Sequence, residues 1–261
     1  APLLRGLRVI KSEEEILLIK EGCAITKSAF ERVLTFVKSG IFEYEIEAEI
    51  THEFICKKAN THAYSPIVAS GKNACVLHYI DNNEQCKDGE LILLDFGAEY
   101  GNYASDLSRT IPVNGVFTPR QKQVYNAVLR VFKGAKANMV EGNTLKKLQS
   151  SVVKNMEKEL IELGLLTVKE IKNQNPEEPV YKKYFMHGTS HFMGLDVHDV
   201  GDREKPFKNG MVLTCEPGIY ILEEGLGVRI ENDILINGVE PIDLMGDIPI
   251  EVDEIEKLMK K

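Results

Sequence analysis

Two stretches of this 261-residue chain share one pattern of apolar residues, acids and glycines. In the first, GELILLDFG, an apolar run ends at Asp95, and in the second, GMVLTCEPG, an apolar run ends at Glu216. Each run begins at a glycine six positions before its acid, and a second glycine follows two positions after it. Beyond a turn-rich segment, a second strand-like run in each stretch carries another acid, Asp106 or Glu231. The pattern predicts two β-hairpins, each with an acid on either arm, related by an internal repeat.

The four acids restrict how these hairpins can be buried. A carboxylate on an apolar strand is costly to bury unless it is paired or bound to a cation. Four converging carboxylates would also repel one another and raise their pKa values. Two divalent cations would remove this repulsion, because four negative charges would then face four positive charges. Oxygen ligands with some imidazole suit Mn, Co, Zn or Fe, so the pattern predicts a metal site that includes a histidine.

Three of the six histidines, His187, His191 and His198, lie in one short segment, YFMHGTSHFMGLDVHD. Two histidines at positions i and i+4 can share a helix face, as in HExxH zinc proteases. The Gly, Thr and Ser residues between His187 and His191 are poor helix formers, so we expect a loop or a strand here. Three histidines that accompany four paired acids favour a metal site over isolated structural histidines.

Helical patterns precede each predicted hairpin. Ser12 with Glu15 forms one capping box, and Thr118 with Gln121 forms another, in which Pro119 takes the first helical position. The expected helices cover 12–40, 43–59, a segment from 118 to beyond 132, and 144–163, whereas 169–179 is polar and expected to be a surface loop. Two helices, strands and a hairpin thus occur twice, which predicts a pseudo-symmetric α+β domain over 1–261. Two separate domains are the alternative, but neither half alone would satisfy its buried acids.

Charge and composition argue against several classes of protein. The net charge of −8 disfavours a nucleic-acid-binding protein, which would show a basic face. No apolar run approaches the ~20 residues that a membrane helix needs, so we expect no membrane partner. The five cysteines are scattered with no CxxC spacing, and the N-terminus lacks the apolar core of a signal peptide. These features predict a reducing, cytoplasmic location.

The ordered acids and histidines resemble the five-ligand dinuclear metal site of the pita-bread metallopeptidases, which include methionine aminopeptidase, prolidase, Xaa-Pro aminopeptidase and creatinase. In this chain the set is Asp95, Asp106, His191, Glu216 and Glu231. The motifs that carry the resemblance are IVASGKNACVLHY, LLDFGAEYGNYASDLSRTIPV, HGTSHFMGLDVHD and LTCEPGIY…GVRIEND, and it covers nearly the whole chain. The last two motifs look most similar to Xaa-Pro aminopeptidases. We therefore expect the pita-bread fold, a pseudo-twofold repeat of two helices plus an antiparallel β-hairpin.

The resemblance implies a role for each of the five ligands. Asp106 and Glu231 would bridge two divalent ions, with Mn²⁺ as the first expectation and Co²⁺, Zn²⁺ or Fe²⁺ as alternatives. Asp95 would complete the coordination of one ion, and His191 with Glu216 that of the other. A metal-bridging water or hydroxide would be the nucleophile, and the metals would stabilise the tetrahedral oxyanion. Glu216 would also transfer a proton to the leaving proline nitrogen.

Further residues match positions around the family's metals. His78, His187 and His198 match histidines that position the substrate and stabilise the transition state. Arg229 lies two positions before Glu231 on the same strand face, so it would anchor an acid, either as a structural salt bridge or as part of the catalytic group. Tyr220 would bind the substrate backbone or pack in the core. The resulting expectations are His78, His187, His198, Glu216 and Arg229 as catalytic residues, and His78, His198 and Tyr220 as substrate-binding residues.

The expected activity is an exopeptidase that hydrolyses the bond before a penultimate proline, with that peptide as partner and a homodimer as an option. An Xaa-Pro dipeptidase (prolidase) is the alternative that the sequence leaves open. The LDVHD extension after the histidine motif disfavours methionine aminopeptidase. Retention of all five ligands disfavours a non-catalytic peptide-binding module and the metal-independent creatinase.

Xaa-Pro aminopeptidases and prolidases usually carry an additional N-terminal domain. This chain begins where their catalytic domain would begin, so we expect a piece of a longer protein or a shorter natural version. The additional domain often contributes to oligomer contacts and to closing the substrate cleft. We therefore expect the catalytic domain alone to bind metals but to act poorly on short substrates.

Overall fold

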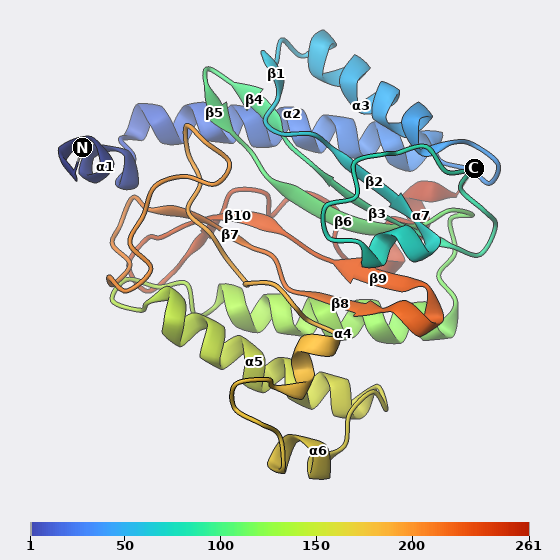
Figure 1. Cartoon of the computed structure of the whole chain (residues 1–261). Coiled ribbons are helices and arrows are strands. Elements are labelled where there is room, and N and C mark those ends of the chain that lie inside the picture. Colours follow the sequence, from blue (N-terminus) through green and yellow to red (C-terminus); the bar gives the residue numbers. More distant parts are fainter. Residues whose placement is uncertain (1, 261) are drawn as a thin grey trace.

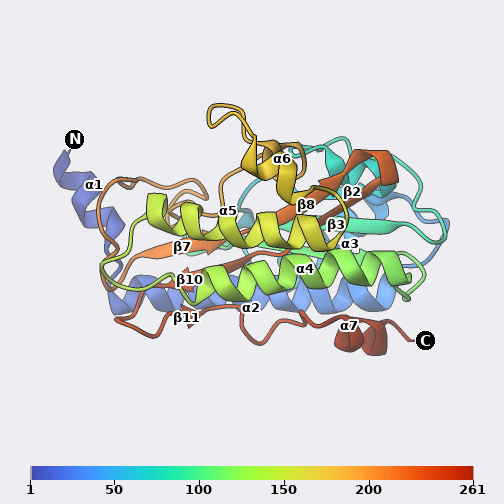
Figure 2. The same cartoon turned by 90° about the horizontal axis from the view of Figure 1, so that it is seen from below.

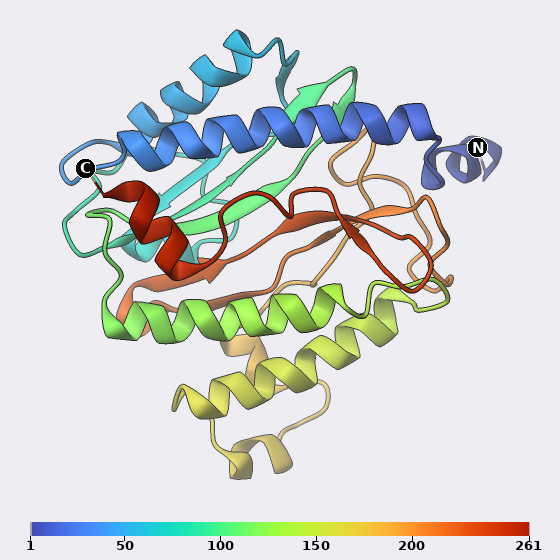
Figure 3. The same cartoon turned by 180° about the vertical axis from the view of Figure 1, so that it is seen from behind.

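Two pairs of helices flank the strands in the computed structural model, which describes residues 2–260. The pairs are α2 (Glu13–Phe36) with α3 (Glu43–Cys56), and α4 (Pro119–Lys136) with α5 (Leu145–Glu162). Helices α2 and α4 run along opposite sides of the strands (Figures 1 and 3), and α4 and α5 cover them when the molecule is seen from below (Figure 2). Shorter helices are α1 (Pro2–Val9), α6 (Val168–Lys172) and α7 (Val252–Met259), with 3₁₀ turns η1 (Gly71–Cys75), η2 (Val180–Lys183) and η3 (Leu222–Glu224).

The helix ends follow the predicted capping signals. The boxes at Ser12 and Thr118 are both formed, and α5 ends just before Gly164, whose φ of +73° suits a glycine. The first two helices end three to four residues earlier than expected, at Phe36 and Cys56. The prediction of a loop from 169 to 179 was wrong in part, because α6 occupies its start. The capping box between Thr167 and Glu170, which starts that helix, had not been recognised.

The strands form small antiparallel sheets in each half of the chain. The first half contributes β1 (Thr61–His62), β2 (Ile67–Ser70), β3 (Leu91–Phe96), β4 (Ala98–Tyr100), β5 (Tyr103–Ala104) and β6 (Leu107–Pro112), in the orders β2-β3-β6 and β1-β4-β5. The second contributes β7 (Val212–Cys215), β8 (Gly218–Ile221), β9 (Leu226–Arg229), β10 (Asn232–Leu235) and β11 (Ile242–Asp243), in the orders β11-β10-β7 and β8-β9. Both predicted hairpins are therefore present, as β3 with β6 and β7 with β10.

The two hairpins differ in register. Cys215 pairs with Asn232, which places Glu216 opposite Glu231, whereas Asp95 pairs with Ser108 instead of Asp106. The halves meet at the bridge between Ser108 and Glu231, where the Glu231 amide donates to the Ser108 carbonyl at 3.0 Å. This bridge brings the acids of both hairpins into one region.

One cluster of buried apolar side chains contains members from both halves, including Phe30 of α2, Phe96 of β3, Phe132 of α4 and Val212 of β7. The two halves therefore share one core, and the single domain stays a prediction. Among the helices of residues 2–260, none combines the length and the apolar character that spanning a bilayer requires.

Candidate metal centre

A cavity of about 420 Å³ lies where the two hairpins meet. Nine of the ten residues singled out in the sequence line it, namely Asp95, Asp106, His191, Glu216, Glu231, His78, His187, His198 and Arg229. The tenth, Tyr220, is buried behind the cavity wall. The remaining lining residues are mostly apolar or aromatic: Tyr64, Ser65, Ile67, Leu77, Ile80 and Val197. Residues separated by more than 150 positions in the sequence therefore share one chamber.

The tightest group of candidate ligands consists of Asp106, His191 and Glu231. One donor atom from each lies within 4.8 Å of the others. His191 Nε2 is 3.4 Å from Asp106 Oδ2, while its Nδ1 is 3.1 Å from the carbonyl of Phe192. Because a carbonyl only accepts, Nδ1 carries the hydrogen, and Nε2 is directed toward the acids. This orientation is the one that a histidine ligand requires.

The other two predicted ligands lie at the edge of this group. Glu216 Oε1 is 3.8 Å from His191 Nε2, and its Oε2 is 3.6 Å from His187 Nδ1. Asp95 is held on both sides, since its Oδ2 is 2.5 Å from the Arg229 guanidinium and its Oδ1 accepts from the Tyr64 hydroxyl at 2.6 Å. Both side chains face the cavity, so the structure brings all five predicted ligands to one site.

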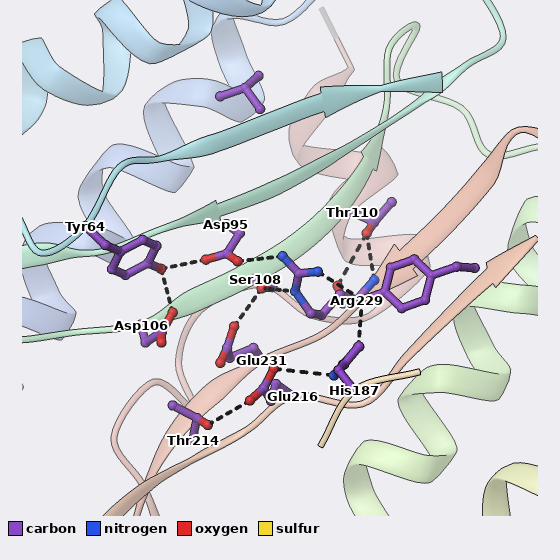
Figure 4. A network of polar contacts seen from close by, with 12 residues as sticks. Tyr64, Asp95, Asp106, Ser108, Thr110, His187, Thr214, Glu216, Arg229 and Glu231 are labelled. Carbon is purple, nitrogen blue, oxygen red and sulfur yellow. Dashed lines mark hydrogen bonds and ion pairs between the residues drawn. The ribbon is translucent and has the colours of Figure 1, made fainter. Parts of the chain in front are cut away.

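Arg229 is the hub of the polar network around the acids (Figure 4). Its Nε donates to Ser108 Oγ at 2.8 Å, and Ser108 Oγ in turn donates to Glu231 Oε2 at 2.7 Å. A second guanidinium nitrogen donates to the Tyr220 hydroxyl at 2.9 Å, and the third bonds Asp95. Arg229 therefore anchors Asp95 directly and Glu231 through Ser108.

Two residues of this network, Tyr64 and Ser108, were missed in the sequence. The Tyr64 hydroxyl contacts both Asp95 and Asp106, and with a single proton it donates to one of them at a time. Its segment, HAYSP, has no repeated counterpart in the second half, so the internal repeat did not point to it. Ser108 could have been recognised from its place two positions after Asp106, on the same strand face.

Hydrogen bonds connect Arg229, Tyr220 and His187 in that order, each residue donating to the next. His187 Nδ1 is 2.8 Å from the Gly188 carbonyl, so Nδ1 carries the hydrogen and Nε2 accepts from the Tyr220 hydroxyl at 2.8 Å. Burial and the nearby Arg229 lower the pKa of His187 to about 4, so the ring is neutral at pH 7. The His187 Nδ1–H that bonds the Gly188 carbonyl lies 3.6 Å from Glu216 Oε2.

The last two predicted histidines lie at the cavity mouth. His198 is exposed and packs edge-on against the His191 ring, with 4.3 Å between ring centroids. Partial desolvation of the imidazole and the nearby His191 lower the pKa of His198. His78 is also exposed and lies on the segment between β2 and β3.

Comparison with known proteins agrees with this arrangement. The profile of metallopeptidase family M24 matches residues 18–238, about 85% of the chain. The chain belongs to metallopeptidase family M24. Among M24 proteins, the Xaa-Pro aminopeptidases of Haemophilus influenzae and Escherichia coli are each 40% identical to it over 99% of its length. The chain spans 62% and 61% of those two proteins.

Solved structures give the same result for the fold. Escherichia coli aminopeptidase P, in a zinc-substituted form with product and in a form with the inhibitor Pro-Leu, is 39% identical and has a TM-score of 0.93. Each comparison covers 99% of this M24 chain and 61% of the other. The predicted family resemblance and the pita-bread fold are confirmed.

The electrostatics of the site fit the divalent ions that an M24 metallopeptidase uses. Burial raises the pKa values of Asp95 and Glu231, and it raises that of Glu216 to about 7. Burial alone would lower the pKa of His191, but the contact with Asp106 outweighs it and raises the pKa to about 9. In the protein alone, the nearby positive charges do not balance the negative charges of the carboxylates. Bound cations would supply the missing positive charge.

Proposed function

We propose that this chain is a metal-dependent aminopeptidase that removes the N-terminal residue from peptides with proline in the second position. One observation carries the proposal: the Asp106, His191 and Glu231 donors converge in a peptide-sized cavity of a chain that is 40% identical to Xaa-Pro aminopeptidases. Oxygen donors with one imidazole suit metal-assisted hydrolysis.

The five candidate ligands divide between two proposed ion positions. Asp106 and Glu231 would be shared, Asp95 would complete one position, and His191 with Glu216 the other. When bound, the ions would supply an activated water molecule and stabilise negative charge on the peptide oxygen. We propose Mn²⁺ as the working ion. The zinc-substituted Escherichia coli structure supports a site of this kind that accepts more than one divalent metal.

The chain itself supplies the proton chemistry and the substrate contacts. Glu216 lies between His187 and His191 on the cavity wall, so its carboxyl group is placed to pass a proton to the departing proline nitrogen. His78 and His198, at the mouth, present imidazole nitrogens that can bind the peptide carbonyls. Tyr220 would act by orienting His187, because its hydroxyl already bonds His187 and Arg229.

The apolar part of the cavity supports the preference for proline. Ile67, Leu77, Ile80 and Val197 line it beside the acids. A pyrrolidine ring is compact and apolar, and it presents no N–H that would have to be satisfied. A cyclic residue therefore fits this wall better than a residue whose amide needs a partner.

We also propose a cytoplasmic location. The five cysteines are all free thiols, and three of them, Cys23, Cys86 and Cys215, are buried. Unpaired cysteines are typical of proteins from reducing compartments.

The test is a cleavage assay on the manganese-loaded chain with three substrates: an Xaa-Pro-Xaa tripeptide, the matching Xaa-Ala-Xaa tripeptide and the Xaa-Pro dipeptide. We expect release of the first residue from the proline tripeptide, with kcat/KM about tenfold or more above that for the alanine tripeptide. Cleavage of the dipeptide alone would identify a prolidase, and equal cleavage of both tripeptides would refute proline specificity. A D106N variant made in parallel controls for contaminating peptidases.

A further inference from the structure

Glu43 carries a fully buried carboxylate that the proposed mechanism does not use. It is the first residue of α3, its exposed fraction is 0%, and it does not line the cavity. Within residues 2–260, no lysine, arginine or histidine forms an ion pair with Glu43. A buried carboxylate without a cation is costly unless hydrogen-bond donors surround it. Its position in the first turn of a helix also favours a negative charge.

The donors that surround this carboxylate all come from segment 70–84. They are Ser70 N and Oγ, each at 2.7 Å, Asn73 Nδ2 at 3.4 Å, the Tyr79 hydroxyl at 2.7 Å and Glu84 N at 2.9 Å. The first three bond one carboxylate oxygen and the last two bond the other. The Glu43 side chain thus forms hydrogen bonds with both ends and the middle of segment 70–84.

Segment 70–84 has little regular structure of its own. It starts at the end of β2, includes the short turn η1, and has no helix or strand from there to β3. A second anchor comes from Asn82, whose side-chain amide donates to Glu47 Oε2 at 2.8 Å, one helical turn beyond Glu43. Its side-chain oxygen accepts from Val68 N at 2.9 Å. Helix α3 therefore holds the segment through two acids on one face.

The same segment carries His78 into the cavity. His78 directly precedes Tyr79, one of the donors to Glu43. Within residues 2–260 the His78 imidazole forms no hydrogen bond or ion pair with another side chain, so the position of the ring depends on its backbone. Leu77 and Ile80, on the same segment, also line the cavity.

We propose that Glu43 is a positioning residue for the reaction: it fixes segment 70–84 and thereby keeps His78 at the mouth of the cavity. The inference rests on the proposed function and adds to it, because it explains what holds the substrate-binding His78 in place. Misplacing a substrate-positioning group by a small distance reduces the rate strongly even when the change lies outside the cavity.

The first test is Glu43→Gln, which preserves size but replaces one acceptor oxygen with an amide nitrogen. Either orientation leaves a backbone N–H, of Ser70 or of Glu84, facing that nitrogen. We expect kcat/KM for the Xaa-Pro tripeptide to fall about tenfold, with the number of bound metal ions unchanged. The matched control is Glu45→Gln in the same helical turn, whose carboxylate bonds the Phe42 amide at 2.7 Å and contacts no donor of segment 70–84. It should stay within about twofold of the unmodified chain.

The second test asks whether Glu43 acts through His78. In a His78→Ala background, adding Glu43→Gln should change kcat/KM by less than about twofold, because the group that Glu43 positions is already gone. A tenfold loss in both backgrounds would overturn the proposal. If Glu43→Gln does not fold, Tyr79→Phe takes its place in the same cycle, since it removes one donor beside His78.

A readout without substrate separates this inference from the proposed function. Backbone amide exchange in segment 70–84 should accelerate in Glu43→Gln and not in Glu45→Gln, because one backbone N–H, of Ser70 or of Glu84, loses its acceptor. Unchanged exchange would overturn the proposal whatever the activity. Faster exchange in a chain that cleaves no Xaa-Pro peptide would support the anchor and overturn the proposed function.

Discussion

The Tyr220 hydroxyl lies 2.8 Å from His187 Nε2 and donates its hydrogen to it. The direction follows from the neighbours, because Arg229 donates to the tyrosine oxygen and the Gly188 carbonyl accepts from the other ring nitrogen. The chain of bonds therefore starts at a buried cation and ends at the Gly188 carbonyl, and the His187 Nδ1 within it lies 3.6 Å from Glu216 Oε2. A network of this kind fixes both the tautomer and the orientation of an imidazole.

Replacing Tyr220 with Phe should therefore impair catalysis more than folding. His187 would lose the donor to Nε2, and its ring would be free to turn away from Glu216. We expect kcat/KM to fall about tenfold with metal content unchanged, as measured by steady-state kinetics and metal analysis. Tyr181→Phe is the control, because Tyr181 lies away from the cavity. A Tyr220→Phe chain with full activity would contradict the orienting role.

Arg229 should not tolerate replacement by lysine. Lysine keeps the charge but lacks the planar fork that here reaches Asp95, Ser108 and Tyr220 together. We expect Arg229→Lys to weaken metal affinity about 10- to 100-fold, measured by calorimetric titration. The control is Arg120→Lys at the partly exposed pair with Glu224, which should bind metal normally. Normal metal affinity in Arg229→Lys would show that Asp95 does not need its anchor.

The stability of the metal-free chain should depend on pH through the buried acids. The pKa of Glu216 is raised to about 7 in the folded chain, from an ordinary value near 4.5. The folded state therefore holds its proton at pH values where the unfolded state has lost it, so stability from this group is full below about pH 4.5 and decreases as pH rises to about 7. For Glu216 the loss is about 3 kcal/mol.

Bound metal should reverse this loss. We expect the gain in melting temperature on adding Mn²⁺ to the chelator-treated chain to be larger at pH 8 than at pH 5. In Glu216→Gln, the metal-free chain should lose part of its pH dependence, because the amide does not titrate. A metal-free chain that is equally stable from pH 5 to 8, with an unchanged profile in Glu216→Gln, would argue against this interpretation.

Gly97 should be intolerant of any side chain. A Cβ at this position would collide with the Ser105 carbonyl oxygen, where the first hairpin bends between Asp95 and Asp106. We expect Gly97→Ala to lower the free energy of unfolding by about 1–3 kcal/mol or more, measured by urea denaturation. Gly6→Ala is the control, since nothing lies within 4 Å of a Cβ added there and alanine favours a helix. Equal stability of the two variants would contradict the described packing.

Spacing along the chain predicted that the candidate ligands would lie together, but it did not predict their hydrogen-bond partners. Asp95, Asp106, Glu216 and Glu231 could be placed together because the same apolar run and glycine pattern occurs twice. The two-residue difference in register between the hairpins could not be foreseen, because pairing across strands depends on the bend near Gly97.

Two of the residues that hydrogen-bond the candidate ligands were not predicted from the sequence either. Tyr64 reaches the acids from a bend after β1 and belongs to no spacing pattern, whereas only the two-position spacing from Asp106 could have pointed to Ser108 of β6. Glu43 begins the acidic run EYEIEAE, which reads as the solvated face of a helix. Its burial results from segment 70–84 folding over it, a contact that local sequence does not encode.

The most direct test of the two-metal account is the activity of the metal-free chain during titration with Mn²⁺, followed on the Xaa-Pro-Xaa tripeptide. We predict no cleavage after chelation and removal of the chelator, and recovery that saturates at two equivalents of bound metal per chain. Asp106→Asn and Glu231→Gln should each fail to recover under the same conditions. Full activity in the verified absence of metal would contradict the account, and so would saturation at a single equivalent.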